Sequence, residues 1–255
     1  MLLFDVGNSR CKWAWVEKGI WLRQGVLANK DVAAWHDLQS SLTAFASPGL
    51  ILLSNVADEE FELRLLKLSD DWNCPVEKVV AQAAQCGVSN AYEQPAQLGS
   101  DRWAALIAAW GQTRQACLVV NCGTATTVDA LSDTGKFLGG LILPGVELMQ
   151  RCLLEYTSRL SQENSSLSGR LQDFPTNTAD AISSGVLLST TGAIRQQHAL
   201  LAEKYSVRCI VSGGAADILM PHLGLQAEKV ENIVLRGMQL IGQDCLTNKA
   251  KINGV

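Results

Sequence analysis

The chain contains one short pattern twice, and this internal repeat limits the folds that it can adopt. Residues 2–7 read LLFDVG and residues 118–123 read LVVNCG, an offset of 116 positions. Each copy is an apolar run, then Asp or Asn, a Gly with small polar residues, a second apolar segment and a turn. This order predicts a strand, a polar turn and a second strand in each copy. Two such units facing each other across a cleft could hold the phosphates of a nucleotide from both sides.

Around the two copies, the hydrophobic pattern predicts alternating strands and helices. The expected strands span residues 1–9, 11–17, 20–28, 50–56, 76–80, 117–121, 125–131, 136–143 and 207–212. The expected helices span residues 30–46, 58–70, a stretch that begins at Ser100 as its N-cap, 145–156, 178–204 and 235–246. Loops are expected at 86–99 and in the polar stretch 157–176. The alternation predicts an α/β protein with an N-terminal lobe of residues 1–115, a hinge near 111–116 and a C-terminal lobe of residues 116–255.

The composition indicates a globular protein and disfavours several classes of partner. Hydrophobic residues make up 47% of the 255 residues and charged residues 18%, which is typical of a folded domain. A net charge of −4 without a Lys/Arg run argues against nucleic-acid binding. No apolar stretch reaches about 18 residues, and the start has no signal-peptide pattern, so no membrane association is expected. The eight cysteines form no CxxC pair, which predicts free thiols in a cytoplasmic protein rather than disulfides or a zinc site.

The first copy continues as Asp5-Val6-Gly7-Asn8-Ser9-Arg10-Cys11-Lys12, a segment suited to phosphate binding. Gly7 allows close backbone approach to an anion, while Arg10 and Lys12 supply positive charge. Asp5, at the end of the expected strand, could hold magnesium directly or through water. The spacing is not that of a Walker A loop. A polar hairpin turn is the competing interpretation, and the second copy makes it the less favoured one.

In the second copy, Asn121 stands where the first has Asp5, and Thr124, Thr126 and Thr127 follow. Hydroxyl groups suit hydrogen bonds to phosphate oxygens. The alternative is a hairpin whose threonines only serve the strand, since Thr favours strands. Near residue 212, the sequence Ser-Gly-Gly after a strand permits close approach to a ring or a phosphate, and a plain strand-to-helix turn explains it equally well.

Gly99-Ser100-Asp101-Arg102 opens one expected helix, where free N–H groups and the helix dipole favour negative charge. Asp101 is therefore expected to be ionised, as a general base must be, and Arg102 could bind a substrate carboxylate. The plain alternative is an acid that complements the dipole beside an ion-paired arginine. Asn177 or Thr178 caps the helix that follows residue 177, and capping alone would explain both.

Six segments together resemble the type III pantothenate kinases, also described as the Bvg accessory factor family. They are DVGNSRCKW at 5–13, YEQPAQLGSDR at 92–102, NCGTATTVD at 121–129, GGLILPG at 139–145, NTADAISSG at 177–185 and SGG at 212–214. The resemblance implies two ribonuclease-H-like lobes of the actin/hexokinase/Hsp70 (ASKHA) superfold with a cleft between them. It also implies a homodimer that phosphorylates pantothenate with ATP and Mg²⁺, the first step towards coenzyme A.

The resemblance also assigns roles to single residues. Asp101 is the implied proton acceptor. The implied ATP site consists of Asp5, Val6, Gly7, Asn8, Ser9, Arg10, Cys11, Lys12 and Thr124, and the implied pantothenate site of Tyr92, Gly99, Ser100, Asp101, Arg102 and Thr178. Asn121 stands where the family commonly has an Asp that binds a monovalent cation. An amide oxygen can coordinate potassium but brings no charge, so the K⁺ or NH₄⁺ requirement stays open.

Two other functions remain open on the sequence. One is a different enzyme of the same superfold, such as a phosphatase or another small-molecule kinase. The other is a regulatory accessory protein without kinase activity. The presence of Asp5, Asp101 and Arg102 together argues against an inactive enzyme, and the missing basic run argues against direct DNA binding.

Overall fold

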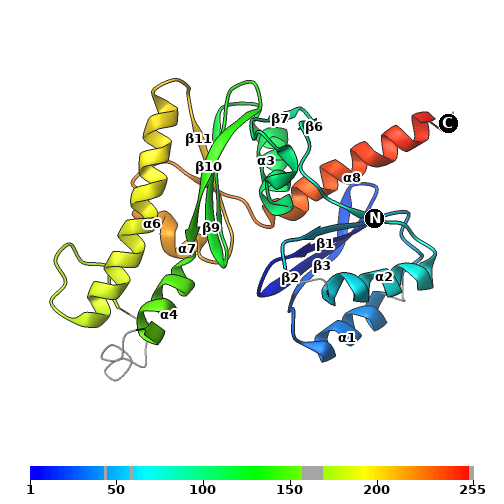
Figure 1. Ribbon diagram of the computed structural model, residues 1–255, viewed down its shortest axis with the longest axis horizontal. Coiled ribbons are helices and arrows are strands. Elements are labelled where there is room, and N and C mark those ends of the chain that lie inside the picture. Colours follow the sequence, from blue (N-terminus) through cyan, green and yellow to red (C-terminus); the bar gives the residue numbers. More distant parts are fainter. Residues whose placement is uncertain (43–44, 58–59, 157–168, 253–255) are drawn as a thin grey trace. The chain divides into compact units, whose positions relative to one another are not determined.

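The computed structural model describes residues 1–42, 45–57, 60–156 and 169–252 (Figure 1). The chain forms two compact units, one of Met1–Gln112 with Asn232–Val255 and one of Thr113–Glu231. The chain first passes from one unit to the other between Gln112 and Thr113, inside the stretch where the sequence predicts a hinge. The chain passes back at Asn232, so the C-terminal helix belongs to the first unit. The lobes predicted from the sequence place that helix in the second.

The first unit is built on a five-stranded sheet with the order β3-β2-β1-β4-β5. Its strands are β1 (Leu2–Val6), β2 (Arg10–Glu17), β3 (Ile20–Ala28), β4 (Ile51–Asn55) and β5 (Val76–Lys78). Strand β1 runs antiparallel to β2 and parallel to β4. Lys18 and Gly19 both have positive φ, 47° and 83°, which is the backbone that a two-residue hairpin turn requires.

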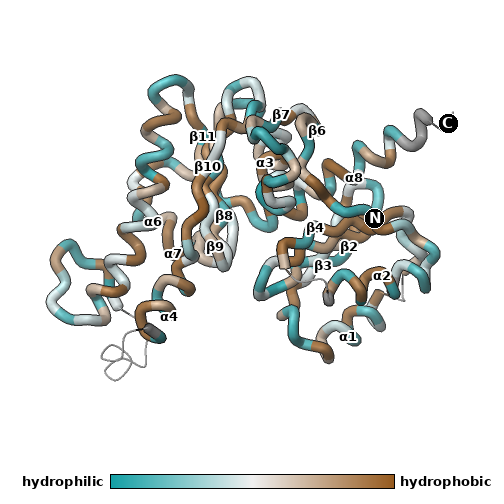
Figure 2. Tube along the Cα trace, in the orientation of Figure 1, coloured by the Kyte–Doolittle hydropathy of each residue, from teal (hydrophilic) through white to brown (hydrophobic). Residues whose placement is uncertain are grey.

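Helices cover both faces of this sheet because its strands are apolar on both sides. On one face Leu2, Phe4 and Val6 join the core formed with α1 (Val32–Leu42) and α2 (Glu60–Trp72). Figure 1 shows these two helices on the same side of the sheet, and Figure 2 shows the apolar strands beside them. On the other face Leu3 and Leu52 are buried, and Leu52 lies against α8 (Ile233–Ile252).

Helix α8 also crosses α3 (Ser100–Thr113) with the two backbones in contact. A β-carbon added to Gly237 of α8 would lie 1.8 Å from the carbonyl oxygen of Ala104 in α3. Only glycine fits such a crossing. Helix α3 is buried on nearly all sides from Arg102 to Trp110. These contacts are the physical reason that the C-terminal helix belongs to the first unit.

The second unit repeats the strand order of the first. Its strands are β8 (Cys117–Cys122), β9 (Ala125–Leu131), β10 (Lys136–Pro144), β11 (Arg208–Ser212) and β12 (Glu228–Lys229), in the order β10-β9-β8-β11-β12. Strand β8 is antiparallel to β9 and parallel to β11, as β1 is to β2 and β4. The internal repeat of the sequence is therefore a repeat of topology.

Helices α4 (Val146–Tyr156), α6 (Thr178–Ala202) and α7 (Ala216–Leu219) pack against one face of the second sheet. Leu118 and Val120 of β8 meet Val186 and Ile194 of α6 in this core. All eight cysteines lie within the described residues and form no disulfide there, and five of them are buried. No helix among the described residues is long and apolar enough to cross a membrane.

The structure differs from the sequence-based expectation mainly in short elements. The expected loop 86–99 contains β7 (Val88–Asn90), which pairs with β6 (Ala84–Gln85), and the 3-10 helix η1 (Pro95–Gln97). A second 3-10 helix, η2 (Met220–His222), follows α7. Of the polar stretch expected to be a surface excursion, residues 157–168 lie outside the described residues.

Candidate active site

Three side chains form a row across the first sheet at the point where β1 ends. Asp5 of β1 is paired with Lys12 of β2 on one side and with Ser54 of β4 on the other. Paired residues point to the same face of a sheet. Their face is opposite to that of Phe4 and Val6, whose side chains lie in the core with α1 and α2. The row therefore lies at the carboxyl ends of two parallel strands, the edge where α/β sheets bind ligands.

The Asp5 carboxyl lies in an unfavourable electrostatic environment. Burial, the largest cause, and the nearby Asp101 carboxyl raise the pKa of Asp5, and Lys12 lowers it, so that together they bring this pKa to about 7. Two carboxyl groups from separate elements, β1 and α3, are thus close enough to repel each other when ionised. A bound cation would relieve this repulsion.

The turn after β1 is fixed by backbone bonds and leaves its side chains accessible. The Gly7 amide donates to the Arg10 carbonyl at 3.0 Å, and the Asn29 Nδ2 group donates to the Gly7 carbonyl at 2.6 Å. Asn8, Ser9 and Arg10 are exposed. The remaining two members of the expected phosphate loop, Val6 and Cys11, have core side chains, so a ligand would meet only their backbone.

Helix α3 begins one residue earlier than the sequence predicts. The Trp103 amide donates to the Gly99 carbonyl at 2.9 Å, which puts Gly99 at the cap position and Ser100 in the first turn. Ser100 is therefore not the N-cap. Its hydroxyl instead shares a hydrogen bond of 2.9 Å with the hydroxyl of Ser54.

Asp101 follows in the same turn and folds back over Gly99. Its Oδ1 accepts a hydrogen bond from the Arg102 amide at 2.8 Å. A β-carbon at position 99 would lie 2.7 Å from this oxygen, so a glycine is needed there for Asp101 to keep its position. Burial raises the pKa of Asp101, against the lowering effects of the Arg102 amide and the Arg102 charge. Desolvation thus outweighs the stabilisation of the charged form at the helix start.

Arg102 is buried, with 6% of its surface exposed, and faces Tyr92. Its Nη1 donates to the Tyr92 hydroxyl at 3.1 Å, and the guanidinium lies 5.9 Å from the centre of the Tyr92 ring. The loop that carries Tyr92 is held by Asn90, whose side chain accepts from the Tyr92 amide and donates to the Pro95 carbonyl. The first unit thus brings together Asp5, Lys12, Ser100, Asp101, Arg102 and Tyr92.

The second unit carries the other predicted residues. Asn121 is paired with Thr127 of β9 and Ser212 of β11, which makes a row that corresponds to the Asp5 row of the first sheet. The Ser212 hydroxyl is buried and has no hydrogen-bond partner within the described residues. Thr124 is exposed in the turn after β8, and its carbonyl accepts from the Gly145 amide at 2.9 Å.

Two open questions of the sequence are decided by local geometry. Gly213 has a φ of +96°, and a β-carbon there would lie 2.4 Å from the Cys122 carbonyl oxygen, so packing alone requires this glycine. Asn177 is the N-cap of α6, because its side chain accepts from the Asp180 amide at 2.9 Å. Capping therefore explains Asn177, and Thr178 is the first helical residue.

The two carboxyl groups suit a magnesium site that substrate phosphates complete, rather than a metal site formed by protein side chains alone. Among the described residues there is no group of three His, Cys, Asp or Glu that could hold a metal. Magnesium is commonly held by one or two carboxylates together with substrate phosphates, and Asp5 with Asp101 would supply that number.

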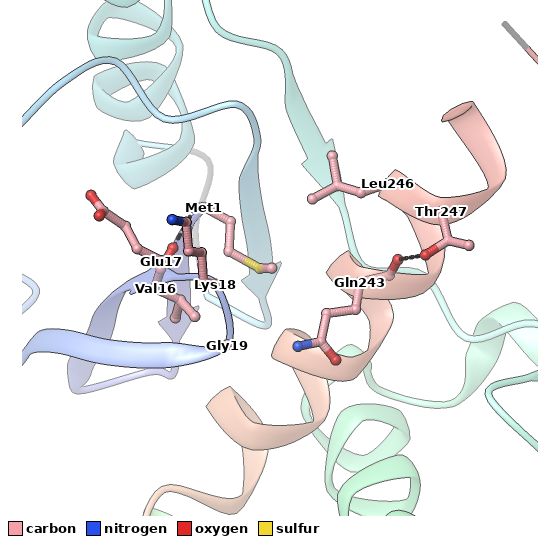
Figure 3. A pocket seen from close by; sticks show the side chains of 8 residues that line it. All are labelled: Met1, Val16, Glu17, Lys18, Gly19, Gln243, Leu246 and Thr247. Carbon is pink, nitrogen blue, oxygen red and sulfur yellow. Dashed lines mark hydrogen bonds between the residues drawn. The ribbon is translucent and has the colours of Figure 1, made fainter. Parts of the chain in front are cut away.

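A pocket of about 500 Å³ lies elsewhere on the first unit (Figure 3). It is formed between the β2–β3 turn and α8, and its lining is Met1, Val16, Glu17, Lys18, Gly19, Gln243, Leu246 and Thr247. None of these residues belongs to the predicted site.

The same order of five strands in both units defines the class of the fold. It is the actin/hexokinase/Hsp70 superfold, with two ribonuclease-H-like lobes. The activator of the 2-hydroxyisocaproyl-CoA dehydratase from Clostridium difficile has this fold, with a TM-score of 0.54 and 9% identity over 100% of this chain and 97% of that chain.

Comparison of sequences identifies the family. The type III pantothenate kinase family model matches residues 1–199. Type III pantothenate kinase from Nitrosospira multiformis is 44% identical over 100% of this chain and 95% of that protein. The protein of the same name from Aromatoleum aromaticum is 41% identical over 96% of this chain and 98% of that protein. The chain belongs to the type III pantothenate kinase family.

Proposed function

We propose that this protein transfers the γ-phosphoryl group of ATP to the primary hydroxyl of pantothenate, giving 4′-phosphopantothenate in the first step of coenzyme A biosynthesis. One observation carries the proposal beyond family membership. Asp101 is half-buried near Asp5 at the start of α3, and the next residue, Arg102, contacts Tyr92. A proton acceptor, a metal-binding acid and a cation for the substrate are thus held in one small region.

Asp101 is the proton acceptor in this proposal. As the pantothenate hydroxyl oxygen forms its bond to the γ-phosphorus, the bond from that phosphorus to the ADP oxygen breaks, and the hydroxyl proton passes to Asp101. Burial raises the pKa of the Asp101 carboxylate, which makes it a stronger base. Its pKa is then nearer to the pH at which the reaction runs.

The turn after β1 binds the phosphates of ATP, with Asn8, Ser9, Arg10 and Lys12 supplying donors and positive charge. Thr124, whose hydroxyl suits the same kind of bond, is proposed as a further ATP contact. Asp5 holds Mg²⁺, which neutralises charge on the phosphates when it is bound. Phosphoryl transfer depends mainly on such positioning and charge stabilisation.

The carboxylate of pantothenate binds to Arg102 through a charge-assisted hydrogen bond. Tyr92 fixes the orientation of the guanidinium. Thr178 is proposed as a further pantothenate contact through its hydroxyl. Gly99 and Ser100 shape the same turn.

Asn121 would hold a monovalent cation, K⁺ or NH₄⁺, only through neutral oxygens, so a requirement for such a cation stays open. The row of Asn121, Thr127 and Ser212 offers one amide and two hydroxyl oxygens. Since no carboxylate is present in that row, the cation binds more weakly than it would beside an Asp. Turnover compared in sodium, potassium and ammonium chloride tests this point.

The protein is proposed to act as a cytoplasmic homodimer, as the family resemblance implies. Sedimentation equilibrium tests the assembly, and a monomer at all concentrations contradicts it.

A coupled assay of ADP release from ATP and Mg²⁺ tests the function itself. Pantothenate is expected to support turnover, whereas water and a panel of other alcohols are not. Equal ADP release with water would indicate a phosphatase. No ATP consumption with pantothenate in any of the monovalent salts would overturn the kinase proposal in favour of a regulatory role.

A further inference from the structure

Ser54 is a polar residue near the end of β4, where it follows three apolar residues and precedes Asn55. Ile51, Leu52 and Leu53 precede it in β4 and are buried. Ser54 is itself fully buried, with 0% of its surface exposed. A hydroxyl in such surroundings needs a hydrogen-bond partner. Nothing in the sequence marks this serine as a site residue, because a single Ser in an apolar run is common in buried strands.

The partner of Ser54 connects β4 to the start of α3. The Oγ atoms of Ser54 and Ser100 lie 2.9 Å apart, and Ser100 directly precedes Asp101. Ser54 is also the strand neighbour of Asp5. The hydroxyl pair therefore joins the two elements that carry the two carboxyl groups, β1 through its neighbour β4 and α3 through its first turn.

Stability alone does not account for this pair. A hydrogen bond between two hydroxyls adds little net stability over two apolar side chains of the same shape. A hydrogen bond does, however, fix direction. The same turn holds two further bonds, from the Arg102 amide to Asp101 Oδ1 and from the Trp103 amide to the Gly99 carbonyl. These two bonds lie within α3, whereas the bond to Ser54 ties the turn to the sheet.

We propose that Ser54 is a positioning residue of the phosphoryl-transfer site, which acts through Ser100 to hold the first turn of α3 so that Asp101 faces the acceptor hydroxyl. The inference rests on the proposed function of Asp101. Because Ser54 is fully buried, it offers no surface to either substrate, so its loss is expected to change the rate of the chemical step and to leave nucleotide binding unchanged.

The test compares the variants Ser54→Ala, Ser100→Ala and their double variant with the wild type. The control is Ser69→Ala in the same unit, since Ser69 donates to the Cys74 carbonyl at 2.6 Å far along the chain from α3. Ser54→Ala is expected to lower kcat with pantothenate about 10- to 100-fold, with the KM for ATP unchanged. The double variant is expected to be no slower than the slower single variant, because both changes break the same bond.

A second measurement does not depend on turnover. Hydrogen exchange of the Arg102 and Trp103 amides is expected to be faster in Ser54→Ala than in wild type, and unchanged in Ser69→Ala. A kcat for Ser54→Ala within about twofold of that of the control overturns the proposal, as do losses that add in the double variant. If the wild type does not phosphorylate pantothenate, the proposed function fails, and the exchange rates still decide whether Ser54 holds this turn: faster exchange supports that role and unchanged exchange overturns it.

Discussion

The two carboxyl groups of the site place opposing demands on the protein. Asp5 and Asp101 are both desolvated, and the charge of Asp101 raises the pKa of Asp5. Ionised together, they destabilise the folded chain. The same arrangement attracts a divalent cation and makes Asp101 a stronger base. Residues that lower stability in this way are typical of active sites.

Asp101→Asn is expected to reduce kcat by about 10²–10⁴-fold, the usual contribution of a general base. The amide keeps the shape of the side chain and cannot accept the proton. ATP affinity, measured by calorimetry, is expected to stay close to that of wild type. Asp71→Asn, an exposed site on α2, is the matched control. A variant at position 101 with wild-type turnover would remove Asp101 from the mechanism.

Asp5→Asn is expected to stabilise the ligand-free protein at neutral and alkaline pH. The pKa of Asp5 is about 7 in the fold and about 3.9 in an unfolded chain. Between these values the folded state binds more protons, so this contribution to stability is present at low pH and is lost as the pH rises through about 7. Thermal denaturation at pH 8 should give a Tm a few degrees above that of wild type.

The gain in Tm should shrink as the pH is lowered and should be absent near pH 4, where wild-type Asp5 is protonated in the fold. Kinase turnover of the same variant should be strongly reduced, since an amide holds Mg²⁺ weakly. A Tm difference that is the same at pH 4 and pH 8 would contradict the assigned environment of Asp5.

Among single residues, the sequence points to those whose side chain is itself charged or reactive. Asp101 and Arg102 are visible as a charged pair that opens a helix, a pattern that an acid complementing the helix dipole also explains, and the family resemblance supplies their expected roles. Ser54 is not visible in this way, because its role depends on a contact with a residue 46 positions away. The reason for Gly213 is likewise a contact, with the Cys122 backbone, and a Ser-Gly-Gly sequence does not distinguish packing from ligand binding.

Among the elements, α3 and α8 cross with their backbones in close contact at Gly237. Gly237→Ala is expected to destabilise the protein by about 1–3 kcal/mol or more, because the added methyl group would overlap the Ala104 backbone. Gly192→Ala in α6 is the matched change, since nothing lies within 4 Å of its added β-carbon. That variant should gain about 0.5–1 kcal/mol from the better helix propensity of alanine. Urea denaturation measures the free energy of unfolding of both variants. Equal effects of the two substitutions would contradict a close backbone contact between α3 and α8.

Long elements follow from the sequence and short ones do not. The strand triplets β1–β3 and β8–β10 are predictable because each has several alternating residues and a turn signal such as Lys18-Gly19. The strands β6 and β12 have two residues each, too few to show a period. The start of α3 is predicted one residue late, because Ser100 has the type of an N-cap residue and its bond to Ser54 is invisible in the sequence.

At the scale of the whole molecule, the two units share one topology and differ in continuity. Two separate segments of the chain form the first unit, and one continuous segment forms the second. The repeat predicts two similar lobes, and the strand orders confirm the fold class. The sequence-based boundaries, 1–115 and 116–255, stay a prediction that leaves α8 in the second lobe. A helical period shows that a helix has an apolar side but not which sheet that side covers, so the placement of α8 required the structure.

A chain that ends at Glu231 is expected to lose the fold of its first unit. Removal of α8 exposes Leu52 and the buried side of α3, and it removes the contacts that Gly237 makes. Hydrogen exchange should show β1 and β4 unprotected while β8 and β11 remain protected. Protection of β1 at the wild-type level would mean that the first unit is stable without its last helix.

The discontinuity of the first unit has a consequence for how the protein is made. The chain leaves this unit after Gln112 and re-enters it at Asn232, so a ribosome completes all of Thr113–Glu231 before it makes the helix that covers α3. At about 5–20 residues per second, this interval is roughly 6–24 s. During it, the inserted unit has all of its strands and can fold, while the uncovered side of α3 and the sheet face that α8 later covers are open to chaperones and to aggregation. The part of the enzyme that carries Asp101 is thus begun first and finished last.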